Sequence, residues 1–232
     1  MRRFLFIASA VLFFSGCAAR ERNSEDDPFV RAIASLRSSV VLFTMKVPSD
    51  DPKRKREFDD AYGSGVIVAS GSWGTQFLTV AHVVQGARNL HVRIEDRREF
   101  PARVVVREEK EDLALVEASV PNLAVAHLGS SNDLRLGQAI GMAGYPLPDA
   151  FTDEQLGVSL SVFSGRIAGL NTDALELDLP IIPGESGGPV FDARTAEVVG
   201  LAQSRFDEER AIGFAIPIDD AVNFLHNHLH GT

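Results

Sequence analysis

The sequence contains one cysteine among 232 residues, too few for an internal disulfide framework or a cysteine-based zinc site. It also lacks an excess of positive charge, because 23 Lys and Arg stand against 32 Asp and Glu, a formal net charge of −9. This charge argues against binding nucleic acid or an anionic membrane through a diffuse basic face. A composition of 45% hydrophobic and 24% charged residues is that of a globular chain and excludes a disordered chain, a collagen-like fibre and a multi-span membrane protein.

The apolar run at the N-terminus, Phe4–Phe14, is too short to span a bilayer. It follows Arg2-Arg3 and precedes Ser15-Gly16-Cys17, which is the build of a secretory signal. The small residues before the cysteine resemble a bacterial lipoprotein signal with cleavage before Cys17, although Phe14 stands where that family usually has Leu. We therefore expect residues 1–17 to be a lipoprotein signal with Cys17 as the lipidated residue. The alternative is an ordinary secretory signal with an incidental cysteine.

Residues 18–34 are mostly polar and charged and predict a solvated tether. The expected location is extracytoplasmic, with a lipid anchor in a bacterial membrane facing the periplasm. Ala18, rather than Asp, follows the cysteine, which by resemblance to enterobacterial lipoproteins favours the outer over the inner membrane. Phe29, Ile33 and Leu36 form an amphipathic segment expected to pack on the folded domain or on a neighbouring subunit of a homo-oligomer.

Short apolar runs separated by turn signals follow from residue 40 onward, enriched in valine and isoleucine, which is typical of β-strands. The first half contains predicted strands at Val40–Thr44, Gly65–Val68, Phe77–Val80, Leu90–Ile94, Ala102–Val106 and Leu113–Glu117. The second half contains them at Ala139–Met142, Ser159–Ile167, Ala174–Leu177, Val190–Phe191, Val198–Ala202 and Gly213–Ile216. Six strands in each half predict an all-β fold of two six-stranded antiparallel barrels, which leave few open edges.

The domain is expected to cover residues 35–232, with barrel one at about 35–125 and barrel two at about 126–218. The end of the sequence has a different pattern. Apolar residues recur there at helical spacing, and Asp219 or Asp220 is placed to cap the start of a helix. These residues predict one closing amphipathic helix over about 219–230.

The segment Gly184-Glu185-Ser186-Gly187-Gly188-Pro189 combines a serine with flanking glycines. Glycine permits tight turns with positive φ and the close approach of a substrate. Such a turn can direct the backbone amides of Gly184 and Ser186 into one hollow, where they would stabilise the oxyanion of a tetrahedral intermediate. Serine attacks only when a base removes its proton. Taken alone, the motif is also explained by a glycine turn between strands.

Two further motifs supply the groups that such a serine needs. His82, in Thr79-Val80-Ala81-His82-Val83-Val84, follows a predicted strand and can serve as general base. Asp112, in Glu111-Asp112-Leu113-Ala114-Leu115, stands at the start of another strand and could accept the second ring N–H of His82. By themselves, a histidine or an aspartate at a strand end more often has a structural role.

The three motifs occur in the order His, Asp, Ser, which is the order of the chymotrypsin arrangement. Together with Gly63–Val68 and Gly213–Pro217, they resemble a trypsin-fold serine protease of the HtrA/Deg family, from about residue 35 to the C-terminus. The resemblance implies the two-barrel fold, with His82, Asp112 and Ser186 in the cleft between the barrels. HtrA proteins usually carry one or two PDZ domains after the protease; the sequence ends just after its last predicted helix, so we expect none in it.

Glu185 departs from the family pattern, because HtrA proteases usually have Asn there and trypsin-like enzymes have Asp. In trypsin-like enzymes that Asp pairs with a newly cut amino terminus, which an acylated Cys17 could not supply. Glu185 must therefore pair with another cation, remain in water, or have a raised pKa. Arg166 and Arg205 are the candidate cations.

The predicted substrate pocket contains no carboxylate in the stretch Leu179–Pro183, which argues against a preference for Lys or Arg. Pro180 and Ile182 are expected on one wall, and Gln203 and Arg205 on or near the other. The resemblance implies cleavage after small or medium apolar residues, whereas an inward-facing Arg205 would favour acidic ones.

The sequence thus predicts a serine endopeptidase of envelope or misfolded proteins, with His82 as base, Asp112 as its orienting group and Ser186 as nucleophile. Two alternatives stay open: a module on the same fold that binds peptides without cutting them, and an esterase-type hydrolase with the same triad. His226 and His230 share a helical face that could bind a metal, but a solvated helix end also explains them, and neither metal nor cofactor is expected. Expected partners are protein or peptide substrates and a membrane, with no nucleic acid.

Overall fold

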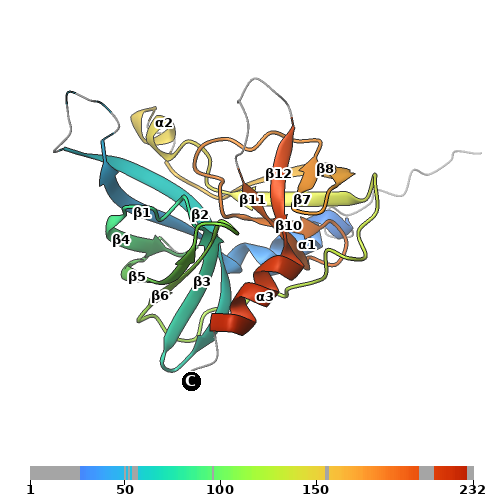
Figure 1. Ribbon diagram of the computed structural model, residues 1–232, viewed down its shortest axis with the longest axis horizontal. Coiled ribbons are helices and arrows are strands. Elements are labelled where there is room, and N and C mark those ends of the chain that lie inside the picture. The colour runs from blue at the N-terminus through green and yellow to red at the C-terminus, as the bar shows by residue number, and fades with distance from the viewer. Residues whose placement is uncertain are drawn as a thin grey trace, which may run out of the picture.

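A computed structural model of the protein describes residues 27–49, 51, 53, 57–95, 97–154, 157–203 and 212–228 (Figure 1). The predicted signal, Cys17 and the first part of the predicted tether lie outside these residues. The described chain forms two barrels of strands, a helix that precedes them and a helix that follows them. No helix in the described part of the chain is long and apolar enough to cross a membrane.

The first barrel contains six antiparallel strands and closes in the order β1-β2-β3-β6-β5-β4. Its strands are β1 (Val40–Pro48), β2 (Phe58–Gly71), β3 (Gly74–Val80), β4 (Arg88–Arg93), β5 (Glu99–Glu108) and β6 (Leu113–Ala118). The pairing of β3 with β6 matters for the site, because it places the end of one strand beside the start of the other: Val80 pairs with Leu113.

The second barrel also contains six antiparallel strands and closes in the order β10-β11-β12-β9-β8-β7. Its strands are β7 (Ala139–Gly144), β8 (Ser161–Leu170), β9 (Leu175–Leu177), β10 (Pro189–Asp192), β11 (Val198–Gln203) and β12 (Gly213–Pro217). The predicted fold of two six-stranded antiparallel barrels is confirmed. A short helix, α2 (Pro148–Asp153), lies between β7 and β8 and was not predicted.

One apolar core extends from the first barrel to the N-terminal helix, to the C-terminal helix and to Phe191 of the second barrel. Phe43 and Phe77 meet edge to face within it, with ring centroids 6.1 Å apart. Phe191 fills the space above Gly141 of the paired strand β7, where an added Cβ would lie 2.2 Å from the ring. Because interiors are packed to crystal-like density, this shared core holds the two barrels in a fixed relation.

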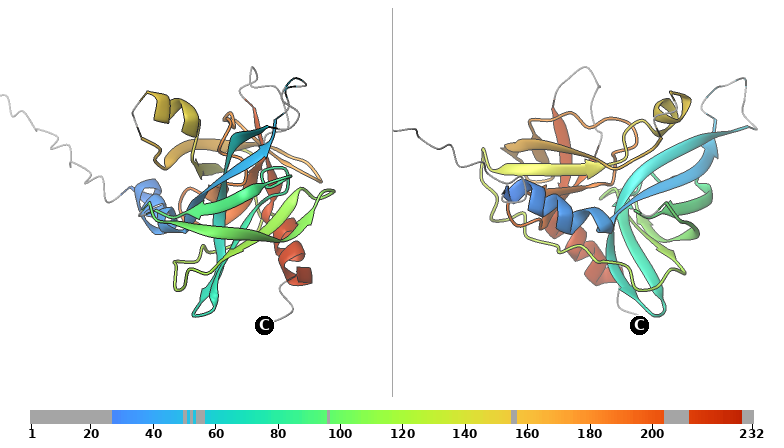
Figure 2. Two further views of the ribbon diagram at one scale, coloured as in Figure 1. Left: turned by 90° about the vertical axis from the view of Figure 1, so that its left-hand side faces the viewer. Right: turned by 180° about the vertical axis from the view of Figure 1, so that it is seen from behind.

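The N-terminal helix α1 (Pro28–Leu36) packs on the barrels, as the rear view in Figure 2 shows. Asp27 accepts a hydrogen bond from the backbone N–H of Phe29 at 2.8 Å, and Pro28 occupies the first turn, so the helix has a regular start. The ring of Phe29 stacks on Phe191 at 5.9 Å. Residues 28–34 are therefore helical rather than part of the predicted tether, because their apolar face packs on the core.

The closing helix α3 (Ile218–His228) buries Ile218, Ala221, Phe224 and Leu225, in agreement with the predicted amphipathic pattern. Asp219 was one of two predicted caps, but its carboxylate has another role. It accepts hydrogen bonds from the backbone N–H groups of Ser131 at 2.7 Å and Asn132 at 3.1 Å. Asp219 therefore ties the segment between the barrels to the last helix.

Candidate active site

His82 and Asp112 meet at the point where strand β3 ends and strand β6 begins. His82 lies two residues after Val80, and Asp112 lies one residue before Leu113, the residue that pairs with Val80. The backbone N–H of Ala81 donates to the carbonyl of Asp112 at 2.9 Å. The strand register therefore brings these two side chains together although they lie far apart in the sequence.

The side chains of His82 and Asp112 form a hydrogen-bonded pair. Nδ1 of His82 lies 2.8 Å from Oδ2 of Asp112, and the backbone N–H of His82 donates to Oδ1 at 2.9 Å. The imidazole is 40% exposed and the carboxylate 16% exposed, so the ring is open to solvent whereas the carboxylate that holds it is mostly buried. Burial raises the pKa of Asp112, but hydrogen bonds from His82 and Gln203 outweigh it and hold the pKa below its ordinary value.

Ser186 lies in the turn before β10, where this turn crosses onto the first barrel. The carbonyl of Ser186 accepts from the backbone N–H of Ser64 at 2.9 Å. The next residue, Gly187, has φ +84° and lies so close to β3 that an added Cβ would be 2.1 Å from Oγ1 of Thr79. Thr79 precedes His82 by three residues, so the Ser186 turn is anchored beside the end of β3 that carries the histidine.

The hydroxyl of Ser64 is a buried support for this turn, and this role was not predicted from the sequence. It donates to the carbonyl of Gly184 at 2.7 Å and accepts from the backbone N–H of Tyr145 at 2.9 Å. Gly184 itself has φ +95°, and an added Cβ would lie 2.3 Å from the carbonyl of Tyr145. A serine between two glycines beside an apolar run was the sequence signal for this role.

We expect Ser64→Ala to lower both stability and hydrolysis. The change leaves the Gly184 carbonyl without its donor and the Tyr145 N–H without its acceptor, which should cost about 1–3 kcal/mol in the free energy of unfolding. A looser Gly184 should also lower kcat. Urea unfolding and steady-state kinetics measure the two effects; equal values for Ser64→Ala and wild type in both would contradict this role.

A family model for the trypsin-like peptidase domain matches residues 63–201. The chain belongs to the trypsin-like peptidase family. A relative in Hahella chejuensis, a probable periplasmic serine endoprotease DegP-like, is 34% identical over 191 residues, which are 78% of this chain and 39% of that protein. The putative serine protease HhoB of Synechocystis is 31% identical over 192 residues, 78% of this chain and 42% of that protein. This peptidase chain thus spans about two fifths of the length of these relatives.

The solved structure of the HtrA-type protease AlgW with tripeptide is similar to this peptidase domain throughout most of the chain. The TM-score is 0.72 at 26% sequence identity, and the match covers 87% of this chain and 64% of that one. These similarities confirm the predicted resemblance to an HtrA-family protease domain and the predicted enzyme class, a serine protease.

Glu185, beside Ser186 in the peptidase domain, is buried to 1% exposure. One carboxylate oxygen, Oε2, accepts from the backbone N–H of Ile182 at 2.9 Å, whereas Oε1 has no hydrogen-bond partner among the described residues. Arg166 is engaged elsewhere, donating to the carbonyl of Gly137 at 2.7 Å, and Arg205 lies outside the described residues. Burial raises the pKa of Glu185 from its ordinary 4.5 to about 7. Of the three alternatives expected for Glu185, a cation partner, exposure to water or a raised pKa, the described structure favours the raised pKa.

Glu185→Gln should make stability less dependent on pH. The pKa of Glu185 is higher in the folded than in the unfolded chain. The stabilisation that the protonated carboxyl gives to the folded state is therefore complete below pH 4.5 and is lost as pH rises through about 7. The introduced glutamine cannot ionise, and its amide oxygen can still accept from Ile182. Urea unfolding from pH 5 to 8 should show the variant gaining about 2–3 kcal/mol relative to wild type. A constant difference over this range would show that the buried carboxyl does not titrate.

The predicted pocket wall before the nucleophile is apolar. Leu179 and Ile181 are buried at 4% and 7% exposure. They pack on β12, where an added Cβ at Gly213 would lie 2.5 Å from the carbonyl of Leu179 and 3.0 Å from Cγ1 of Ile181. Their neighbours Pro180 and Ile182 are less buried and therefore remain the candidates for substrate contact. Gln203 differs, because its amide contacts Asp112.

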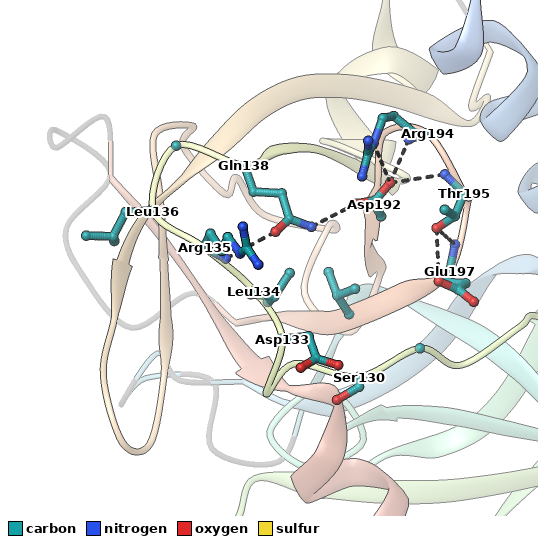
Figure 3. Close-up of a pocket in the computed structure, with 13 residues that line it drawn as sticks. Ser130, Asp133, Leu134, Arg135, Leu136, Gln138, Asp192, Arg194, Thr195 and Glu197 are labelled. Carbon is teal, nitrogen blue, oxygen red and sulfur yellow. Dashed lines mark hydrogen bonds and ion pairs between the residues drawn. The ribbon is translucent and has the colours of Figure 1, made fainter.

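A hollow of about 880 Å³ lies on the second barrel, and none of the predicted catalytic residues lines it (Figure 3). Several of its polar groups bond to one another: Gln138 donates to Oδ2 of Asp192 at 2.8 Å, and the backbone N–H groups of Arg194 and Thr195 donate to Oδ1. Because these groups satisfy each other, they are not available as a convergent set of donors and acceptors for a ligand.

The described histidines near the C-terminus, His226 and His228, do not form a metal site with each other. His226 is exposed on α3, His230 lies outside the described residues, and His228 packs against Phe224 with its Nε2 3.8 Å from Glu108. No group of three or more potential metal ligands occurs within the described part of the chain.

Proposed function

We propose that the protein is a serine endopeptidase in which Ser186 is the nucleophile, His82 the general base and acid, and Asp112 the group that orients His82. The observation that carries this proposal is the His82–Asp112 pair, with Nδ1 2.8 Å from Oδ2, at the strand end against which the Ser186 turn is anchored. A carboxylate on Nδ1 leaves Nε2 of the same ring free to take a proton from a serine hydroxyl.

The reaction proceeds in two halves. Oγ of Ser186 attacks the carbonyl carbon of the scissile bond while its proton passes to Nε2 of His82, and Asp112 stabilises the resulting imidazolium. The tetrahedral intermediate collapses as the imidazolium gives the proton to the leaving amine, and an acyl-enzyme remains. Water then attacks the acyl carbon with His82 again as base, and the proton returns to Oγ of Ser186 as the carboxylic acid leaves.

The backbone amides of Gly184 and Ser186 form the proposed oxyanion hole. Neither amide donates a hydrogen bond to a backbone carbonyl within the described residues, and both belong to one tight turn. The turn is held by the bond from Ser64 to the Gly184 carbonyl at 2.7 Å. Fixed, unengaged donors are what stabilises a developing oxyanion without reorganisation.

The proposed substrates are exposed or unfolded segments of envelope proteins, with small or medium apolar residues before the scissile bond. Pro180 and Ile182, the less buried residues of the predicted wall, support this preference, because they offer no carboxylate to a Lys or Arg side chain. The names of the relatives in Hahella chejuensis and other bacteria support a periplasmic location. Cys17 is proposed as the lipid attachment site that holds the enzyme to a membrane, the outer one in preference to the inner, and a homo-oligomer is part of the proposal.

A cleavage profile on a peptide library tests this function and the pocket together. The full-length protein should cut internal peptide bonds after small or medium apolar residues, and mass spectrometry of the products should identify the bonds. Cleavage mainly after Lys or Arg would contradict the pocket assignment. Binding of peptides without any cleavage, or hydrolysis of matched esters alone, would contradict the endopeptidase.

A further inference from the structure

Gln203, the last residue of β11, is a polar side chain at 3% exposure. Its Nε2 donates a hydrogen bond to Oδ2 of Asp112, the same oxygen that lies 2.8 Å from Nδ1 of His82. Its Oε1 is buried and has no partner among the described residues. A buried amide oxygen without a partner lowers stability, so a glutamine at this position calls for an explanation other than packing.

The bond between Gln203 and Asp112 connects the two barrels, because β11 belongs to the second barrel and Asp112 to the first. It also completes the set of donors on the carboxylate. Oδ1 receives the backbone N–H of His82, and Oδ2 faces both the His82 ring and the Gln203 amide. Three donors in different directions prevent the carboxylate from rotating about its Cβ–Cγ bond.

We propose that Gln203 is a positioning residue for hydrolysis: its amide holds the Asp112 carboxylate in the orientation that bonds Nδ1 of His82. The inference rests on the proposed function of the triad. It also replaces the expected role of Gln203 in the substrate pocket, since a buried amide bonded to Asp112 is not available to a substrate.

The same amide tunes the charge that Asp112 presents to His82. The hydrogen bond from Gln203 withdraws part of the negative charge from Oδ2, which the imidazolium form of His82 shares. Lys110 and Glu111, the charged residues that precede Asp112 in the sequence, line a hollow beside α3 together with Asp173 and Asp220, and neither His82 nor Asp112 lines that hollow. Loss of the Gln203 donor should therefore leave more negative charge facing His82 and stabilise the imidazolium.

The test compares Gln203→Met and Gln203→Glu with the matched control Gln138→Met. Gln138 also donates to a carboxylate, Oδ2 of Asp192 at 2.8 Å, but it lines the hollow on the second barrel. Gln203→Met should lower kcat about tenfold or more with KM unchanged, since it removes a charge-assisted bond. The acid limb of the pH–rate profile should move to higher pH in Gln203→Met. It should move less in Gln203→Glu, because a buried carboxyl this close to Asp112 keeps its proton and can donate it to Oδ2 in place of the amide. The control should keep the wild-type kcat and profile.

Stability separates positioning from packing. Gln203→Met removes Oε1, which has no partner among the described residues, as well as the donor, so its thermal midpoint should equal or exceed that of wild type while its kcat falls. A kcat loss that follows a fall in the thermal midpoint, with an unmoved acid limb, would overturn the inference in favour of a structural role.

NMR titration of the His82 ring in a Ser186→Ala background supplies a readout that needs no hydrolysis. The ring signal should titrate at higher pH when Gln203→Met is added, and at the unchanged pH with Gln138→Met. An unmoved titration would overturn the inference even if the wild-type enzyme is active. Absence of hydrolysis by wild type together with a moved titration would instead count against the proposed function and support the contact.

Discussion

Ser186→Ala should abolish peptide hydrolysis while the fold is retained. Removal of the nucleophile from a serine protease triad lowers kcat by about 10⁶-fold, and what remains reflects binding and the oxyanion hole alone. The replacement deletes one oxygen at a site of 7% exposure whose backbone bond to Ser64 is unaffected. Product formation by mass spectrometry measures the loss, and circular dichroism measures the fold.

Ser164→Ala is the matched control for this variant, because Ser164 lies exposed on β8, on the outside of the second barrel. It should hydrolyse peptides at the wild-type rate. Hydrolysis by Ser186→Ala comparable with that of the Ser164→Ala control would remove Ser186 from the mechanism.

Asp112→Asn should lower kcat by about 10⁴-fold with little effect on KM. The asparagine has nearly the size of the aspartate, so the turn between β5 and β6 should keep its shape. Its oxygen, however, can keep the bond from the backbone N–H of His82 only by turning the NH₂ group toward Nδ1, and this group donates a hydrogen bond and carries no charge to balance an imidazolium. The ring then adopts the tautomer that carries the proton on Nε2, the atom that must receive the proton of Ser186.

The control for Asp112→Asn is Asp60→Asn, since Asp60 pairs with Lys46 at 2.8 Å on the exposed surface of the first barrel. Such a surface ion pair contributes about 0–1 kcal/mol, so kcat should stay at the wild-type value. A kcat for Asp112→Asn within a factor of a few of this control would show that Asp112 is a structural residue at a strand start.

The fold could be predicted from the sequence because its determinants are local. Each apolar run of β-branched residues is short and ends at a turn signal, and all twelve predicted strands overlap strands of the structure. The motifs also placed His82 at the end of one strand and Asp112 at the start of another, and the pairing of these two strands, β3 and β6, brings the side chains together.

Other parts of the site depend on tertiary contacts that no local pattern encodes. Gln203 ends a strand of the second barrel, and its bond to Asp112 exists only because the barrels pack together. The burial of Glu185 likewise depends on how its turn folds over Gly144, where an added Cβ would lie 3.3 Å from Cβ of Glu185. The tether predicted at residues 18–34 extends too far, because the helix α1 begins at Pro28 and is held by a contact of Phe29 with Phe191, a residue far along the chain. The packing of Phe29, Ile33 and Leu36 on the folded domain was predicted from their spacing and is confirmed.

The central claim is that Ser186 is activated by His82. It is tested most directly by reaction with a fluorophosphonate, which phosphonylates an activated serine, followed by mass spectrometry of the digested protein. The account predicts one adduct per chain, on Ser186, that forms in wild type and is lost in His82→Ala. No adduct on Ser186 in folded wild-type protein, or equal labelling of Ser186 in His82→Ala, would contradict it.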